Sequence, residues 1–310
     1  MNLLEIGQLT EDQAREYIEK QRWPNGIECP HCHNKGEQGL ISDMQGASHR
    51  AGLYFCGACR KQFSATVGTL MEDSHLTMKQ WLTAFHLMSS SKKGISALQL
   101  QRELGIGSYK TAWFLAHRIR EAMNDNPISG LLQAKLKGKV EVDETYIGGK
   151  PRKGSKGEVK RGRGTKKAAV MVLVERDGKA HSRPVEKVNA KTLKGAIREM
   201  VEKDSTIYTD EWASYQGIGE EFDGGHEVVN HSQGEYARGE ANTNTAESYI
   251  ALLKRGVHGV FHHVSKQHLH RYCNEFSFRW DNRKVDDGER TKNALKGMSG
   301  KRLMYQAKTA

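Results

Sequence analysis

Apolar residues between positions 77 and 123 recur at intervals of three and four, which is the period of an amphipathic helix. The period is interrupted at 105–107 by Gly-Ile-Gly, and Ser108 follows as a helix N-cap. The stretch therefore predicts a run of helices containing one tight turn. The positions that define the period are Trp81, Leu82, Phe85, Met88, Leu98, Leu104, Ala112, Leu115, Ala116, Ile119 and Met123.

Further along the chain the pattern becomes strand-like. Val140 and Val142 alternate with charged residues. The stretch 168–174 is a continuous apolar run, and 205–210 is a short strand-like segment. An amphipathic helix is predicted at 191–203, between two of these strands. This order predicts an α/β fold in which a mixed sheet is flanked by helices.

Changes in residue composition and in the hydrophobic pattern divide the chain into five predicted segments. The part rich in Gly, Cys and His is expected to be a ribbon of short strands held together by a bound metal ion. So small a unit buries too little apolar surface to be stable without such a ligand. The last part loses its periodicity and is expected to be a loosely held tail. The segments are an N-terminal helical segment at 1–22, the ribbon at 23–70, a helix-turn-helix-like region at 75–125, an α/β domain at 135–285 and the tail at 286–310.

The chain is strongly basic, with 48 Lys and Arg against 37 Asp and Glu, a formal charge of +11 and a pI of about 9.3. Nucleic acid is the natural partner for this excess, and an anionic membrane surface is the alternative. No apolar run approaches the ~18 residues that span a bilayer, and the first residues lack a signal-peptide pattern. We therefore expect a cytosolic protein that binds nucleic acid.

Positive charge is densest at 150–167, inside the predicted α/β domain. Glu158 is the only acid there, so self-repulsion together with glycine predicts a flexible loop. This loop is expected to hold DNA. Its basic residues are Lys150, Arg152, Lys153, Lys156, Lys160, Arg161, Arg163, Lys166 and Lys167.

Four of the five cysteines form two C-x-x-C pairs, at 29–32 and 56–59. Such a knuckle lets two thiolates converge on one ion, so two knuckles predict a structural Cys₄ zinc site. A redox dithiol is the alternative, but it needs only one pair and a βαβ context that is absent here. His31 and His33 are second choices as ligands, and Cys273 is expected to be packed or free. The predicted ligands of one zinc ion are Cys29, Cys32, Cys56 and Cys59.

The segment at 95–123 has the layout of a helix-turn-helix. In that geometry the residues that open the second helix reach base edges, and later basic residues meet phosphates. A plain helical hairpin with a solvated charged face is the alternative interpretation. The base-edge candidates are Ser108, Tyr109 and Lys110, and the phosphate candidates are His117, Arg118 and Arg120.

Two acids lie on predicted strands. In KVEVDETYIGG, alternation places Glu141 and Asp143 on the face opposite the two valines. In STIYTDEWASY, Asp210 shares a face with Tyr208 and ends the strand. Taken singly, each acid is an ordinary solvent-facing residue.

A third acid lies on a predicted helix in NTNTAESYIALLKRG. Asn244, Glu247 and Lys254 share one side of this helix, which is suited to face the sheet edge with the two strand acids. Three converging carboxylates suit two Mg²⁺ or Mn²⁺ ions beside a scissile phosphate, because such ions prefer hard oxygen ligands. Lys254 would then be a point charge for a DNA phosphate. The apolar stripe of the same helix is Ala246, Tyr249, Ile250 and Leu253.

Together these motifs resemble the ISXO-like group of bacterial insertion-sequence transposases, in the DDE, RNase H-like superfamily. The resemblance rests on the two cysteine knuckles, VDETYIGGK, YTDEWASY, NTNTAESYIALLKRG and the segment at 262–283, and it runs almost end to end. It implies an RNase H-like catalytic domain. The residues that match the family's acids are Asp143, Asp210 and Glu247, and Lys254 matches the basic residue seven positions after the third acid.

Three neighbours of these acids are alternative candidates. Some relatives have asparagine in place of the third acid, so Asn244 competes with Glu247 for a metal. Glu144 and Glu211 directly follow the two candidate aspartates. On a strand Glu144 points to the face opposite its neighbour, which favours the aspartate.

The resemblance implies a DNA transposase that binds the terminal inverted repeats of its insertion sequence. It would free a 3′-OH by metal-dependent cleavage and join it to target DNA, as a homo-oligomer on paired ends in the bacterial cytosol, with no nucleotide cofactor. The alternatives are a nuclease that cuts but does not join, and a DNA-binding regulator, against which the three acids argue. Further DNA contacts are expected from Lys254, Arg255, Lys266, Arg271, Arg279 and Arg283.

Overall fold

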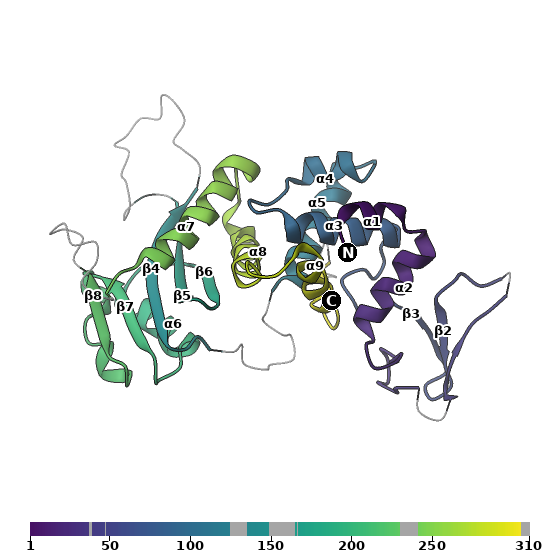
Figure 1. Ribbon diagram of the computed structural model, residues 1–310, viewed down its shortest axis with the longest axis horizontal. Helices are drawn as coiled ribbons and strands as arrows, with labels where there is room; N and C mark the ends of the chain where they lie inside the picture. Colours follow the sequence, from purple (N-terminus) through teal and green to yellow (C-terminus); the bar gives the residue numbers. More distant parts are fainter. Residues whose placement is uncertain are drawn as a thin grey trace. The chain divides into compact units, whose positions relative to one another are not determined.

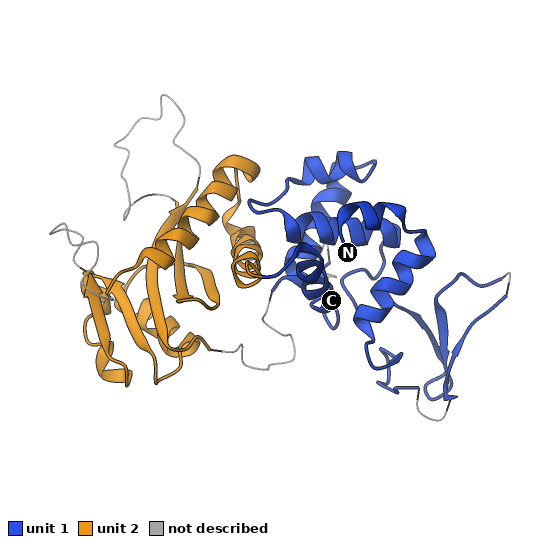
Figure 2. Ribbon diagram, viewed as in Figure 1, with its two compact units in different colours: residues 1–124, 285–310 blue, residues 125–284 orange. Residues whose placement is uncertain are grey.

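The chain forms two compact units, Met1–Asn124 with Val285–Ala310, and Asp125–Lys284 (Figure 2). In the described part of the chain, no helix is both long and apolar enough to cross a membrane. The computed structural model describes residues 1–36, 39–46, 48–124, 135–148, 165, 167–229 and 241–304.

Five strands build the sheet of the second unit: β4 (Lys139–Ile147), β5 (Ala168–Glu175), β6 (Ala180–Val185), β7 (Thr206–Asp210) and β8 (His226–Val229). Their order is β6-β5-β4-β7-β8 (Figure 1). Strands β4, β5 and β6 pair antiparallel, whereas β4, β7 and β8 pair parallel. The mixed sheet predicted from the sequence is therefore confirmed.

Helices cover both faces of this sheet: α6 (Ala190–Met200) one face, α7 (Asn244–Gly256) and α8 (Leu269–Asp281) the other (Figure 1). The apolar run of β5 explains the three layers. Met171 and Leu173 pack with α6, whereas Val170, Val172 and Val174 pack with α7 and α8, and all five are fully buried. A strand that is apolar on both sides needs cover on both sides.

Both helices that were predicted to be amphipathic bury one apolar side. In α6 the buried residues are Leu193, Ala196 and Ile197. The stripe predicted for α7 is buried in the cluster that it shares with β5 and α8. The remaining turns of this unit are η2 (Ala213–Tyr215), η3 (Gly219–Glu221), η5 (Val257–Phe261) and η6 (Lys266–His268).

The first unit contains six helices among its described residues: α1 (Leu3–Gln8), α2 (Glu11–Arg22), α3 (Met78–Ser90), α4 (Ala97–Glu103), α5 (Tyr109–Ala122) and α9 (Asp287–Lys296). The sequence indicated a loosely held tail where α9 lies, which is wrong. Asp286 caps this helix by accepting from the Glu289 N–H at 2.8 Å, and Ala294 and Leu295 are fully buried. The His86 ring of α3 lies 3.0 Å from the Thr291 hydroxyl of α9. A ten-residue helix with so few apolar residues leaves little periodicity to detect.

The ribbon is a three-stranded antiparallel sheet of β1 (Ile41–Asp43), β2 (Leu53–Cys56) and β3 (Lys61–Ser64). Its core is small. Trp23 packs edge-on against Tyr54 and Phe63, with ring centroids 5.9 and 6.0 Å away. Aromatic pairs of this kind stabilise a fold, but three rings with Ile27, Ile41 and Val67 beside them are a small core for a sheet of this size.

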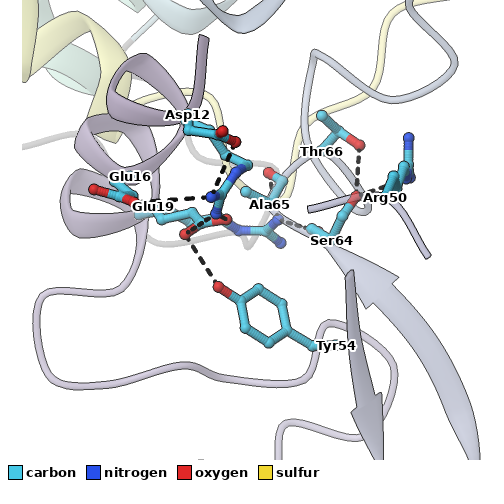
Figure 3. A network of polar contacts seen from close by, with 10 residues as sticks. Asp12, Glu16, Glu19, Arg50, Tyr54, Ser64, Ala65 and Thr66 are labelled. Atoms are coloured by element: carbon cyan, nitrogen blue, oxygen red, sulfur yellow. Dashed lines mark hydrogen bonds and ion pairs between the residues drawn. The ribbon is translucent and has the colours of Figure 1, made fainter. Parts of the chain in front are cut away.

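Helix α2 is fastened to the ribbon by a polar network (Figure 3). The Tyr54 hydroxyl donates to Glu19 on α2 at 3.1 Å. The Arg22 guanidinium, at the end of α2, donates to the carbonyls of Ala65 and Val67 at 2.7 and 2.6 Å. Burial lowers the pKa of Arg22 to about 10. The helix and the ribbon therefore form one folded piece.

Candidate active site and zinc centre

Four cysteine side chains converge from the two knuckles of the ribbon. Their Sγ atoms all lie within 4.8 Å of one another. Among the described residues, this is the one group of metal-ligating side chains that closes so tightly. The Sγ atoms of Cys29 and Cys59, and those of Cys32 and Cys56, are 3.7 Å apart. Four thiolates converging on one point match the ligand set of a structural zinc ion.

The two knuckles have the same backbone shape. His33 and Arg60, each directly after a cysteine pair, have φ of +60° and +58°, which is uncommon for residues other than glycine. Their N–H groups donate to the carbonyls of Cys29 and Cys56, at 2.9 and 2.7 Å. The N–H of Cys59 helps to lower the pKa of the Cys56 thiol to about 7. The backbone therefore favours a thiolate at Cys56, whereas burial and the neighbouring thiols raise the pKa values of Cys59 and Cys32.

The two alternative histidine ligands lie outside the thiol cluster. His31 is exposed, and the His33 ring lies 2.9 Å from the Glu28 carboxylate. The four cysteines thus form the ligand set without help from either histidine.

The predicted helix-turn-helix corresponds to α4 and α5, joined by a turn in which Gly105 has a φ of +62°. A left-handed φ explains glycine at that position. Ser108, Tyr109 and Lys110 at the start of α5 are exposed, and 52% of the Tyr109 surface is accessible. Ser108 stands at the N-cap position but makes no side-chain capping bond. Its hydroxyl therefore does not cap α5.

The prediction that His117, Arg118 and Arg120 on α5 contact phosphates is wrong. Arg118 is 9% exposed and Arg120 only 2%, and His117 is fully buried. The Arg118 guanidinium stacks on the Phe114 ring at 4.5 Å, and burial lowers its pKa. Because α5 packs against α3, α4 and α9, its second half has no solvent-facing side.

The three candidate catalytic acids come from three elements of the second unit. Asp143 lies on β4, Asp210 ends β7, and Glu247 lies in the first turn of α7. In the parallel β4–β7 pair, Glu141 is opposite Tyr208. Asp143 and Asp210 each come two residues after this pair, so strand alternation places both on the face of Glu141, which α7 covers.

The pKa of Asp143 is affected by the charges of the other two candidate acids. Burial raises the pKa of this carboxyl from 3.8 to about 7, and the charge of neighbouring Glu144 adds to the shift. The charges of Asp210 and Glu247 raise it further, although the N–H of Glu144 donates to the Asp143 Oδ1 at 2.7 Å and opposes the shift. A half-buried carboxylate surrounded by other acids is a site that favours a cation.

The alternative Glu144 points away from this site. Its carboxylate accepts a hydrogen bond from the Tyr215 hydroxyl at 3.0 Å, and Tyr215 belongs to the core on the α6 side of the sheet. Glu211, the alternative to the second aspartate, is exposed. Both Asn244 and Glu247 are exposed on α7.

The raised pKa of Asp143 predicts how the stability of the magnesium-free protein depends on pH. The folded state binds the Asp143 proton more tightly than the unfolded state does. The protonated carboxyl therefore contributes fully to the free energy of unfolding below about pH 4, and this contribution is lost as pH rises through about 7. Three pKa units correspond to at most about 4 kcal/mol, and solvent screening of a half-exposed group reduces this figure. We expect Asp143→Asn to remove this loss.

Urea unfolding of wild type and Asp143→Asn in magnesium-free buffer, at pH values from 4 to 8, measures the effect. The variant should gain stability relative to wild type between about pH 4 and 7, and the gain should level off toward pH 8. A difference that does not change with pH would show that Asp143 has an ordinary pKa.

The other predicted DNA contacts divide into four groups. Lys254 is half-buried on α7, and Arg255 and Lys266 are exposed. The prediction that Arg279 contacts DNA is wrong, because this residue is only 6% exposed and pairs with buried Glu275 at 2.6 Å. Arg271 is half-buried, and Arg283 donates to the Gly178 carbonyl at 2.9 Å. The loop candidates Lys153, Arg161, Arg163 and Lys166 lie outside the described residues.

Glu141 and Arg176 lie near the candidate acids, and no role was predicted for either of them from the sequence. Glu141 is fully buried on the same face as Asp143, and Arg176 pairs with it at 2.6 Å. The one signal in the sequence is an acid two positions before Asp143. Its partner comes from the end of β5, which no local pattern indicates.

Comparison with known proteins assigns the family. Residues 135–281 match the ISXO2-like transposase domain, and residues 9–62 match the transposase zinc-ribbon domain. The chain is 30% identical over 283 residues to an uncharacterized protein in transposable element ISH50 of Halobacterium salinarum, covering 87% of this chain and 91% of that protein. The chain belongs to the ISXO2-like transposase family. The resemblance seen in its sequence motifs is confirmed.

The family assignment agrees with the geometry of the ribbon. The zinc-ribbon match includes all four cysteines and also α2, which the Tyr54–Glu19 bond fastens to the sheet. A structural zinc ion in this transposase is supported by both observations.

Two solved structures are distantly similar. One is the Mos1 transposase paired-end complex with left transposon end, at 15% identity and a TM-score of 0.29, covering 65% of this chain and 69% of that one. The other is the Mos1 strand transfer complex, at 14% identity and a TM-score of 0.30, covering 69% and 74%. Both likenesses are weak.

Proposed function

We propose that this transposase binds the terminal inverted repeats of an insertion sequence and catalyses metal-dependent DNA cleavage and strand transfer. Asp143, Asp210 and Glu247 are the proposed catalytic acids, and Lys254 is the proposed phosphate contact beside them. The observation that supports this function best is that the charges of Asp210 on β7 and Glu247 on α7 both raise the pKa of Asp143 on β4, as expected of acids that lie near one another.

The donor set fits Mg²⁺ or Mn²⁺. The three acids offer only hard oxygen atoms, and their mutual repulsion is relieved by a cation. Two such ions stabilise the attacking and leaving oxygens of a phosphoryl transfer. The protein's own part is to hold the three carboxylates on rigid strands and a helix, and to keep Lys254 on the same helix as Glu247.

The proposed partner is double-stranded DNA, both transposon ends and target, bound by a homo-oligomer on paired ends. The exposed start of α5, with Ser108, Tyr109 and Lys110, is the proposed base-reading surface. Exposed Arg255 and Lys266 follow the acids along the chain and are proposed phosphate contacts. The basic stretch at 150–167 is proposed to add further phosphate contacts.

A joining assay tests the proposal and separates it from simple hydrolysis. Labelled duplexes ending in the element's terminal repeats are incubated with the full-length protein, a supercoiled plasmid and Mg²⁺. Strand transfer predicts label covalently joined to the plasmid, and only when the duplex has a terminal-repeat sequence. Cut but unjoined ends would identify a nuclease instead, and binding without either product would identify a DNA-binding regulator.

A further inference from the structure

A buried ion pair lies on the same face of the sheet as Asp143. Glu141 is fully buried on β4, two residues before Asp143 and on the same face of the sheet. Its Oε1 accepts from the Arg176 Nε at 2.6 Å. Burying a carboxylate is costly unless its oxygens are paired and hydrogen-bonded, so the partners of this group show what it does.

The second oxygen of Glu141 caps α7. Its Oε2 accepts from the N–H of Ala246 at 2.9 Å. Thr243 stands at the N-cap position of α7 but makes no side-chain capping bond. A carboxylate on β4 therefore takes the place of a local cap, satisfying one unpaired N–H and stabilising the positive end of the helix. The next residue along α7 is Glu247.

Arg176 contacts two of the elements on which the acids lie, β4 and β7, and also the segment that leads into the third, α7. It pairs with Glu141 on β4, and its guanidinium lies 4.1 Å from the centre of the Tyr208 ring on β7. Its Nη2 donates to the carbonyl of Asn242, two residues before α7, at 2.8 Å. Its own backbone N–H donates to the Lys139 carbonyl at the start of β4, at 2.9 Å. The guanidinium is thus held in place from several directions.

We propose that Glu141 and Arg176 form a positioning pair, which fixes the acid of α7 against the two acids of the strands. The inference rests on the proposed metal-dependent function of those acids. Because Glu141 is fully buried and each of its oxygens already accepts a hydrogen bond, we assign the pair a positioning role rather than metal ligation. Loss of the ion pair should let the start of α7 shift. We expect this shift to weaken metal binding at the three acids more than it lowers the stability of the fold.

The test is Glu141→Gln, which keeps the shape and an acceptor for Ala246 but loses the charge. The matched control is Glu275→Gln, because Glu275 is equally buried and pairs with Arg279 at the same 2.6 Å, but lies on α8 away from the acids. Joining rates are measured against Mg²⁺ concentration, with full-length protein, at a temperature where melting curves show both variants folded.

Glu141→Gln should raise the half-saturating Mg²⁺ concentration about tenfold, the usual effect of removing a group that orients metal ligands. Glu275→Gln should lower the melting temperature but leave the Mg²⁺ dependence at the wild-type value. If Glu141→Gln does not fold, Arg176→Lys is assessed by the same criterion, because it keeps a cation beside Glu141 but loses the second arm that reaches Asn242.

An unchanged Mg²⁺ dependence in the folded variant, or an equal shift in Glu275→Gln, would overturn the positioning role. Wild type and Asp143→Asn, assayed alongside, separate this failure from that of the proposed function. If wild type joins ends and Asp143→Asn does not, the function stands whatever the Glu141 result. If wild type shows no metal-dependent joining, it is the function that fails.

Discussion

Loss of zinc is expected to unfold the ribbon and abolish binding to transposon ends. The apolar core of this sheet is small, three aromatic rings with Ile27, Ile41 and Val67, whereas a structural zinc ion contributes about 10–16 kcal/mol to the folding of small zinc domains. Cys59→Ser removes one ligand without adding bulk. The variant should purify with little zinc, and amide hydrogen exchange should show lost protection across 23–67 but native protection in the sheet of the second unit.

Cys273→Ala is the control, because Cys273 is fully buried in the second unit, outside the ligand set. It should retain a full equivalent of zinc and a protected ribbon. Native protection of 23–67 in a zinc-free Cys59→Ser protein would show that packing alone folds the ribbon. Its polar network with α2 would then be the main stabilising contact (Figure 3).

Substitution of any one catalytic acid should lower the joining rate by about three orders of magnitude. Metal ions contribute several kcal/mol of transition-state stabilisation in phosphoryl transfer, and about 4 kcal/mol corresponds to a factor of a thousand. Asp143→Asn, Asp210→Asn and Glu247→Gln each remove one negative oxygen donor with little change of shape. Single-turnover joining, with end binding measured separately, gives the size of each loss.

Two further variants make this prediction specific. Asp177→Asn changes an acid of the same unit that is 95% exposed and pairs loosely with Lys284, so joining should stay within a few-fold of wild type. Asn244→Ala tests the competing metal contact and should also have a small effect. A thousandfold loss in Asn244→Ala together with a small loss in Glu247→Gln would move the third metal contact to position 244.

Local periodicity was sufficient to predict the layers of the second unit. The apolar run of β5 and the stripe of α7 are properties of neighbouring residues, and the structure buries both as expected. Strand alternation also placed Asp143 and Glu144 on opposite faces, and Tyr215 holds Glu144 on the α6 side.

Features that depend on distant parts of the chain were not predictable in this way. Arg118 and Arg120 have the spacing of a basic DNA-binding face, but α3, α4 and α9 enclose that part of α5. Nothing near Arg176 in the sequence indicates that it meets Glu141 and the approach to α7. The cysteine knuckles are the exception, because their spacing alone specifies the ligand set.

The most direct test of the central claim is the ion dependence of Asp143→Cys. Thiolate is a poor ligand for Mg²⁺, whereas Mn²⁺ accepts softer donors more readily. Joining is measured in each ion and divided by the wild-type rate in the same ion. Direct coordination by the residue at position 143 predicts no detectable joining in Mg²⁺ and recovery in Mn²⁺. Equal relative rates in the two ions would contradict the assignment of Asp143 as a catalytic metal ligand.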